Sequence, residues 1–211
     1  KLQYFNMIKN LHQSGFKTWL EKVENILKEA NMGSLQDQDY LENKAGNLKH
    51  IYNSVKQALY DNFTNSWPTE INEYPKMRTY VTFKQELRME TYLLEIKDFK
   101  LRRLLSRFRL SSHDLEIERG RYLKPPVPAS ERFCKTCQNN CIEDEKHILV
   151  ECQTYSKLRS DFFEKLPRGI TVLENPFAQI MSSKISTTIF LTCKFLEKAL
   201  LKRSQILNMV C

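Results

Sequence analysis

The chain has 211 residues, of which 41% are hydrophobic, and its 33 Lys and Arg against 25 Asp and Glu give a net charge of +8. This length is sufficient to bury a hydrophobic core, and the hydrophobic content argues against a disordered chain. The apolar runs are far too short to cross a bilayer, so we expect no membrane contact. The basic excess suggests an anionic partner, with nucleic acid as the first candidate.

Apolar residues recur at helical spacing through most of the chain, which predicts a mainly helical fold. Two helices are expected over residues 3–13 and 16–31, separated by Gly15, and a longer one over residues 39–63. Residues 65–68, NSWP, should end this third helix because a proline interrupts the backbone hydrogen bonding.

Residues 76–84 alternate polar and apolar side chains, which leaves helix and strand open, and we favour a short helix or turn. A helix is expected over residues 155–166, and one or two helices over residues 176–209. Residues 125–128, PPVP, predict a stiff extended linker before a cysteine-rich segment.

Residues 99–110, FKLRRLLSRFRL, show the sharpest helical periodicity. The predicted apolar face comprises Leu101, Leu104, Leu105 and Phe108. The opposite face is predicted to carry the guanidinium groups of Arg102, Arg103, Arg107 and Arg109. Arginine suits bidentate contact with phosphate, so this row is the first candidate nucleic-acid surface. The alternative is a solvated face paired with acids such as Glu116 and Glu118.

Further basic residues are expected to extend this surface. They are Arg78, Lys84, Arg119, Arg121 and Lys124. Since no separate recognition helix with polar base-reading side chains is evident, we expect contact through the backbone phosphates, with structured RNA favoured over duplex DNA.

Residues 134–152, CKTCQNNCIEDEKHILVEC, carry a Cys-x2-Cys-x9-His-x4-Cys pattern. Its predicted metal ligands are Cys134, Cys137, His147 and Cys152. Three thiolates and one imidazole are the donor set of a closed structural Zn2+ site, which leaves no open position for catalysis. Disulfides and ordinary buried thiols are the alternatives, and we favour zinc because a histidine stands where a fourth ligand is needed. We expect Cys141 to be a spare thiol in the loop.

The spacing also constrains the backbone around the second pair of ligands. On an unbroken α-helix the side chains of His147 and Cys152 would diverge by about 140°, so the helix should kink or end near Glu151. The acidic run over residues 143–145 is expected to cap this helix, and His113 to be a structural hydrogen-bonding residue.

Motifs typical of several enzyme classes are absent from the sequence. There is no glycine-rich phosphate loop, GxSxG, HExxH or Tyr-x-Asp-Asp motif, so we expect a chain without catalytic activity. The enzyme alternative is a nuclease that uses Glu143, Asp144 and Glu145 with a divalent ion, although such sites need carboxylates from separate elements.

Several segments together resemble the C-terminal region of non-LTR (LINE-type) retrotransposon reverse transcriptases. These are KMRTY (76–80), FRLSSHDLEIERGRY (108–122), ERFCKTC (131–137), IEDEKHILVEC (142–152) and TYSKLRSDFF (154–163). In that family a Cys-Cys-His-Cys zinc finger follows the polymerase domain. The chain departs from the family pattern at Gln153, where proline is frequent, and in carrying Cys141.

The resemblance implies a zinc-stabilised domain that binds the element's RNA, with target DNA as a second candidate, during target-primed reverse transcription. It implies further that the polymerase domain of the same polyprotein is a partner, and that the protein is part of an intracellular ribonucleoprotein, nuclear and cytoplasmic. The alternative is a structural zinc module that mediates protein-protein contacts. We predict four segments: helical residues 1–66, basic helical residues 67–124, a zinc-finger module at 125–166, and helical residues 167–211.

Overall fold

The computed structural model describes residues 2–33, 48–84, 86–137, 139–167 and 175–210. Helices account for 71% of the structure, and the described residues form no strand. Two extended residues, Phe133 and Ile142, pair in an isolated antiparallel bridge. The predicted mainly helical fold is therefore confirmed. The chain divides into two compact units, Lys1–Thr69 and Glu70–Cys211, and the predicted four-segment division remains a prediction.

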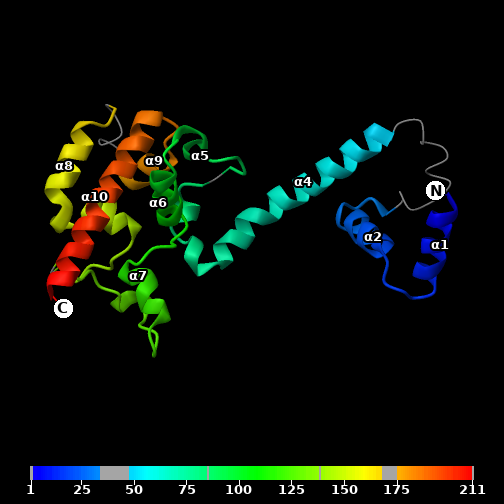
Figure 1. The fold of residues 1–211 in the computed structure, drawn as a ribbon, viewed down its shortest axis with the longest axis horizontal. Coiled ribbons are helices and arrows are strands. Elements are labelled where there is room, and N and C mark those ends of the chain that lie inside the picture. Colours follow the sequence, from blue (N-terminus) through cyan, green and yellow to red (C-terminus); the bar gives the residue numbers. More distant parts are fainter. Residues whose placement is uncertain (1, 34–47, 85, 138, 168–174, 211) are drawn as a thin grey trace. The chain divides into compact units, whose positions relative to one another are not determined.

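The first unit contains α1 (Leu2–Gln13), α2 (Trp19–Glu29) and most of α4 (Leu48–Glu73) (Figure 1). Gly15 lies between α1 and α2 with a φ of 84°, a left-handed conformation that glycine adopts without steric cost. The two predicted N-terminal helices are confirmed. Of the third predicted helix, residues 39–47 lie outside the described residues.

The prediction that residues 65–68 end the third helix was wrong. Helix α4 continues through Pro68 and ends at Glu73. Proline removes one backbone hydrogen bond from a helix but does not always end it. The helix ends before a second proline instead, because Tyr74 precedes Pro75 and is extended (φ −88°, ψ 112°), the conformation that this position favours.

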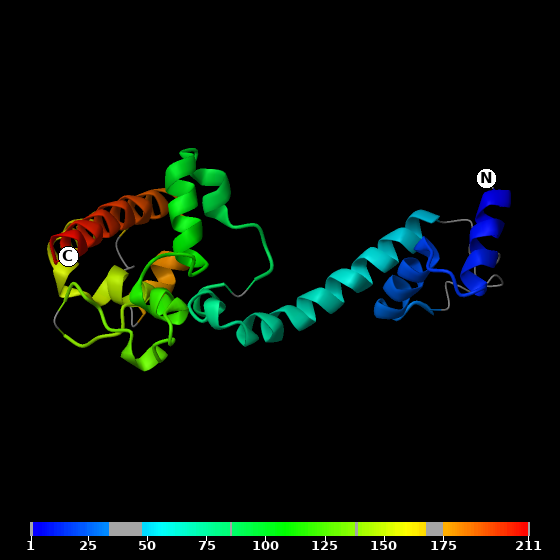
Figure 2. The same cartoon turned by 60° about the horizontal axis from the view of Figure 1, so that its bottom comes forward.

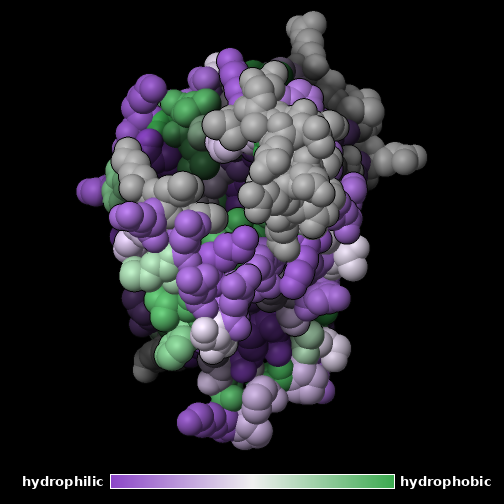
Figure 3. Space-filling view, turned by 90° about the vertical axis from the view of Figure 1, so that its right-hand side faces the viewer, coloured by the Kyte–Doolittle hydropathy of each residue, from purple (hydrophilic) through white to green (hydrophobic). Residues whose placement is uncertain are grey.

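The first unit buries little of its apolar surface. Helix α2 has no buried residue, although Asn62 of α4 donates a hydrogen bond to the carbonyl of Glu29. The large apolar side chains exposed on α1, α2 and their junction are Tyr4, Met7, Leu11, Phe16, Trp19, Val23 and Ile26. The space-filling view shows apolar surface (green) among predominantly hydrophilic surface (Figure 3).

The second unit contains the remaining helices. Its α-helices are α5 (Thr91–Glu95), α6 (Phe99–Arg109), α7 (Glu116–Arg119), α8 (Ser156–Glu164), α9 (Pro176–Ser182) and α10 (Ser186–Val210). Its 3-10 helices are η3 (Pro75–Met77), η4 (Tyr80–Thr82), η5 (Gly120–Tyr122), η6 (Ala129–Glu131) and η8 (Gln153–Tyr155), and η7 (His147–Glu151) is a π-helix. The short turns expected over residues 76–84 and the two C-terminal helices are confirmed.

Helix α10 is the centre of the second unit and packs against α6 and α8 (Figures 1 and 2). Its buried residues Leu196 and Ala199 face the core, to which α6 contributes Leu101, Leu105 and Phe108. Helix α6 begins where the Asp98 carboxylate accepts hydrogen bonds from the backbone N–H groups of the first helical turn. Among the described residues no helix combines the length and apolar character needed to cross a membrane.

Candidate metal centre and basic surface

The four predicted metal ligands lie together in the second unit. Cys134, Cys137, His147 and Cys152 are all buried, and their ligand atoms lie within 4.8 Å of one another. The Sγ atoms of Cys134 and Cys152 are 4.0 Å apart, and Cys137 Sγ is 3.3 Å from His147 Nε2. Tetrahedral zinc with bonds of about 2.0–2.3 Å separates its ligand atoms by about 3.5–3.8 Å. These side chains therefore match the size of a four-coordinate metal site.

A short antiparallel segment positions the Cys134–Cys137 pair. The backbone N–H of Cys134 donates to the carbonyl of Cys141 at 2.8 Å, and that of Glu143 donates to the carbonyl of Arg132 at 3.0 Å. Asn140, directly before Cys141 in the loop between these two segments, has a left-handed φ of 49°, a conformation that asparagine tolerates in turns. Cys141 thus contributes its carbonyl to the turn, while its thiol lies outside the four-residue cluster.

The second ligand pair is placed by the π-helix η7. The backbone N–H of Cys152 donates to the carbonyl of His147 at 2.7 Å, an i to i+5 hydrogen bond. A π-helix has more residues per turn than an α-helix, so five residues make little more than one turn. The side chains of His147 and Cys152 therefore lie on the same side, whereas on an α-helix they would diverge. The helix ends at Glu151, because Cys152 itself is extended (φ −58°, ψ 124°). The predicted helix end near Glu151 is confirmed.

Both ends of η7 are held by charged side chains. The Asp144 carboxylate accepts a hydrogen bond from the backbone N–H of His147 at 2.7 Å. Arg159 of α8 donates to the carbonyls of Leu149 at 3.0 Å and Cys152 at 2.7 Å. The expected helix cap is therefore formed by Asp144, whereas the contribution of Arg159 was not predicted from the sequence.

His147 presents Nε2 to the sulfur atoms and Nδ1 to Glu151. Nδ1 is buried and has no hydrogen-bond partner among the described residues, but a Glu151 carboxylate oxygen lies 3.7 Å away. A metal-ligating histidine commonly directs its second nitrogen to a carboxylate, which fixes the ring orientation. His147 Nε2 is therefore turned towards the cysteine sulfur atoms, as ligation of a metal ion through this atom requires, while Nδ1 is near a carboxylate without being hydrogen-bonded to it.

Without a metal ion, the thiols of the three cysteines differ in pKa. A hydrogen bond from Cys152 lowers the pKa of the Cys134 thiol to about 2, with help from His147 and Thr136. The same hydrogen bond, together with burial, raises the pKa of Cys152, and burial raises that of Cys137.

Two buried glutamates join the metal centre to the helical body. Glu143 accepts two hydrogen bonds from Arg203 of α10, at 2.8 and 2.6 Å, and one from the backbone N–H of Glu116. Burial opposes both charges and raises the pKa of Glu143 in spite of Arg203, whereas the pKa of Arg203 is raised by its contact with Glu143; the two hydrogen bonds between them favour the charged pair. The buried position of Arg203 could have been inferred from the sequence. Arg203 stands seven residues after the buried Leu196 and therefore lies on the same side of the helix.

Glu145 is fully buried and faces a different set of partners. It accepts hydrogen bonds from Arg78, Thr79, Ser111 and His113. Burial opposes its charge, but the hydrogen bond and charge of His113, with the charge of Arg78 and the hydroxyl of Ser111, lower its pKa to about 2. The predicted structural role of His113 is confirmed. Glu143 and Glu145 thus bind arginines that lie on separate elements, and this is the arrangement of structural ion pairs.

The row of arginines on α6 is only partly exposed. Arg103 and Arg107 are exposed, and Arg102 is half-buried, donating to the carbonyl of Ile96 at 3.2 Å. Arg107 donates to the carbonyl of Ser112 at 2.7 Å, which orients its guanidinium group.

Arg109 does not belong to an exposed face, and its placement there was wrong. It is 4% exposed, donates to Glu90 at 2.7 Å and to the carbonyl of Met181, and stacks on Phe83 and Tyr92. The physical reason is its register. Arg109 follows Leu105 by four residues, so the two side chains are only about 40° apart around the helix.

The other predicted basic residues also include some that are held in ion pairs and some that are exposed. Arg78 and Arg121 both pair with the buried Glu118, and Lys84 pairs with Glu90 at 2.7 Å. Arg119 and Lys124 are exposed. Arg119 lies 3.6 Å from Glu116, a long contact at an exposed guanidinium that contributes little to stability.

Two of the exposed arginines meet at one hollow of about 420 Å³ between α6, α7 and the end of α10. Arg107 and Arg119 line it, and the one carboxylate among its lining residues is the exposed Asp114. Its apolar lining residues, which define what we call the α6–α7 hollow, are Leu104, Phe108, Leu115, Leu200 and Leu207. The fold therefore brings together two predicted phosphate-binding residues that are twelve positions apart in the chain.

Comparisons of the chain with protein-family models, with curated proteins and with solved structures found no match.

Proposed function

We propose that this chain is a non-catalytic, zinc-stabilised domain that binds nucleic acid through the phosphate backbone. The observation that carries the proposal is the meeting of exposed Arg107 and Arg119 at the α6–α7 hollow. Guanidinium groups from two helices can approach one phosphate from two sides, and arginine forms bidentate contacts with phosphate oxygens. Arg103 lies four residues before Arg107 and extends the same face of α6.

Zinc is the metal that the donor set favours. Three sulfur atoms and one imidazole nitrogen are soft and borderline ligands, which select Zn2+ over Mg2+ or Ca2+. Four protein ligands complete a tetrahedron, so the ion has a structural role. Through Glu143 and Arg203 the metal centre is connected to α10, which packs against α6. The ion would thereby hold the helices that carry the exposed arginines.

The resemblance to non-LTR retrotransposon reverse transcriptases supports RNA as the ligand. We infer that this RNA is the element's own transcript, with target DNA as the second ligand, and that the polymerase domain of the same polyprotein is the partner. In such a ribonucleoprotein, binding through phosphates would retain the template near the polymerase without reading much of its sequence.

The test is filter binding of the zinc-loaded chain to a structured RNA and to duplex DNA over a range of salt concentrations. The variant carries R103Q, R107Q and R119Q together. Each lost phosphate contact lowers the slope of log K against log salt by about 0.7–0.9. We therefore expect the slope to fall by about 2–3, and the affinity to fall with it.

The matched control removes three other exposed positive charges of the second unit, through K157Q, K165Q and K198Q. It has the same net charge as the arginine variant, so an equal loss of slope in both would reject the assignment to specific residues. Absence of any salt-dependent retention would favour the alternative, a zinc module that mediates protein contacts. The exposed apolar side chains of α1 and α2 are the observation that speaks for this alternative.

A further inference from the structure

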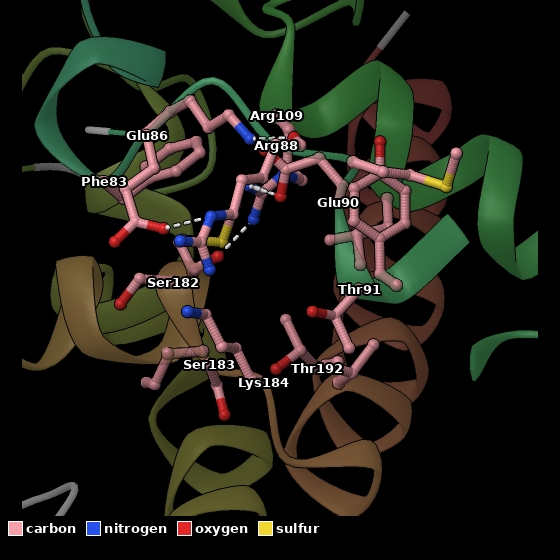
Figure 4. Close-up of a pocket in the computed structure, with 17 residues that line it drawn as sticks. Phe83, Glu86, Arg88, Glu90, Thr91, Arg109, Ser182, Ser183, Lys184 and Thr192 are labelled. Atoms are coloured by element: carbon pink, nitrogen blue, oxygen red, sulfur yellow. Dashed lines mark hydrogen bonds and ion pairs between the residues drawn. The ribbon is translucent and has the colours of Figure 1, made fainter. Parts of the chain in front are cut away.

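A second hollow of the same unit is larger, and it lies apart from the metal centre. It has a volume of about 470 Å³ and is formed by residues 83–84 and 86–92, α6 and the junction of α9 with α10 (Figure 4). We call it the α6–α9 pocket. Its volume lies within the range of about 300–1,000 Å³ that is typical of sites for small molecules.

The inner wall of the α6–α9 pocket is apolar. Its buried lining residues include Tyr92, Leu105, Ile180, Met181 and Ile189. These side chains come from α5, α6, α9 and α10, so the wall is held by four helices of one packed unit. Each of these side chains is almost entirely covered by the packed helices, so a group that enters the pocket meets them only at its base.

The pocket has a positive excess, since its lining residues include four cations and two carboxylates. Glu90 is already neutralised by Lys84 and by Arg109, each at 2.7 Å, and Glu86 pairs with Arg88 at 3.2 Å. The Arg88 side chain is 75% exposed, and its ion pair with the exposed Glu86 is weak enough for an anionic ligand to compete for the guanidinium group.

Lys184 supplies a second cation from the opposite side of the pocket. It is exposed, and no ion pair joins it to another of the described residues. With Arg88 it makes the accessible surface of the pocket suited to an anionic group.

Four hydroxyl side chains also line the pocket. Figure 4 shows Thr91 and Thr192 on one side of the opening, and Ser182 and Ser183 on the other. The hydroxyl of Thr192 donates to the carbonyl of Thr188 at 2.7 Å, and its lone pairs can still accept. Ser183 Oγ accepts from the backbone N–H of Ile185 at 3.2 Å and can still donate.

We propose that the α6–α9 pocket binds one nucleotide unit of a single-stranded nucleic acid. Arg88 and Lys184 take its phosphate, the threonine and serine hydroxyls face its sugar and the polar edge of its base, and the base lies against Ile180, Met181 and Ile189. A charged entrance with an apolar platform for an unstacked base is the general design of single-strand binding. The proposal rests on the proposed function, because it specifies how part of a bound strand is held.

The pocket makes the proposed RNA binding selective for unpaired nucleotides. A paired base inside a duplex cannot enter a hollow of this size without leaving its stack. The arginines at the α6–α7 hollow, in contrast, contact phosphates and do not require unpaired bases. A structured RNA with an exposed loop or bulge would engage both sites.

The experiment is methyl NMR of the zinc-loaded full chain labelled at isoleucine and methionine. Adenosine 5′-monophosphate should shift the methyl signals of Ile180, Met181 and Ile189 in a saturable manner, whereas inorganic phosphate at the same concentration should leave them in place. The variant R88E/K184E should bind the nucleotide at least tenfold more weakly. The control K165E/K198E, which makes the same charge change at two exposed lysines, one directly after α8 and one on α10, should bind it as the original chain does.

The outcomes separate this proposal from the proposed function. Unshifted methyl signals in a chain that binds RNA with a strong salt dependence would overturn the pocket and leave the proposed function standing. Equal losses in R88E/K184E and K165E/K198E would overturn it as well. Shifts by the nucleotide in a chain that does not retain RNA would overturn the proposed function and the strand as ligand, and would leave the pocket as a site for a free nucleotide. Circular dichroism of both variants verifies that they fold.

Discussion

Arg203, near the end of α10, binds both carboxylate oxygens of Glu143, which precedes it by 60 residues and lies between the two pairs of metal ligands. The two distances are 2.8 and 2.6 Å, and both side chains are almost entirely buried. This contact makes the metal centre and the central helix of the second unit interdependent.

Replacing Arg203 by Met should strongly destabilise the second unit. The substitution keeps much of the side-chain volume but leaves the Glu143 carboxylate buried without its main partner, which typically costs about 3–5 kcal/mol. Urea unfolding of the zinc-loaded chain, followed by circular dichroism, measures the change. Lys198→Met on the exposed side of α10 is the control and should change the free energy of unfolding by less than about 0.5 kcal/mol. A similarly small change for R203M would mean that Glu143 is solvated or protonated.

The metal ligands could be predicted from the sequence because their signal is local. A Cys-x2-Cys pair followed by a histidine and a cysteine defines a donor set by residue type and spacing alone. The end of the helix at Glu151 followed from the angle between two residues on one helix. Both inferences need only residues that are close in the chain.

The contacts that position the metal centre could not be predicted in this way. Arg203 binds Glu143, which is 60 residues away in the sequence, and Arg159 binds backbone carbonyls, which every residue carries. No local sequence pattern identifies either kind of partner. Arg109 is a different case, since its 40° offset from Leu105 was available from helical geometry and indicates a buried position. The continuation of α4 through Pro68 shows that a proline weakens a helix without defining its end.

Arg109 and its neighbours on α6 should respond to substitution in opposite ways. R109M removes one of two cationic partners from the half-buried Glu90 and the stacking on Phe83 and Tyr92, so we expect a loss of about 1–3 kcal/mol in the free energy of unfolding. The double variant R103Q/R107Q changes exposed side chains, and we expect less than about 1 kcal/mol. Thermal unfolding of each variant provides the comparison.

In nucleic-acid binding we expect the opposite order, with the larger effect in R103Q/R107Q and the smaller one in R109M. R103Q/R107Q should lower the salt slope by about 1.5–2, whereas R109M should leave the slope unchanged at a temperature where it is folded. A loss of slope in folded R109M would contradict the buried position of its guanidinium group.

The metal centre should hold about one zinc ion per chain, and the four ligands should be individually required. Elemental analysis of protein purified under reducing conditions measures the ratio. C152S should lose the zinc, and its far-ultraviolet circular dichroism should melt at a lower temperature, because η7 and α8 are no longer held to the Cys134–Cys137 turn. C141S is the matched control and should retain the metal, since its thiol lies outside the cluster. Loss of zinc in C141S but not in C152S would require a different ligand set.

Cys193 of α10 should make the stability of the second unit depend on pH in the alkaline range. Burial raises the pKa of its thiol from 9.0 to about 12. Its contribution is therefore fully present below pH 9 and is lost as the pH rises towards 12, because the unfolded chain gains stability by ionising the thiol first. At pH 10.5 the loss should reach about 2 kcal/mol, from about 1.4 kcal/mol per pH unit.

The measurement is the difference in unfolding free energy between the original chain and Cys193→Ala at pH 8 and at pH 10.5. That difference should shrink at the higher pH, since alanine has no proton to lose. Leu196→Ala, at another fully buried position of α10, is the control, and its difference from the original chain should stay constant with pH. If both differences were constant, the Cys193 thiol would ionise equally in the folded and unfolded chains, and it would not be buried in the core.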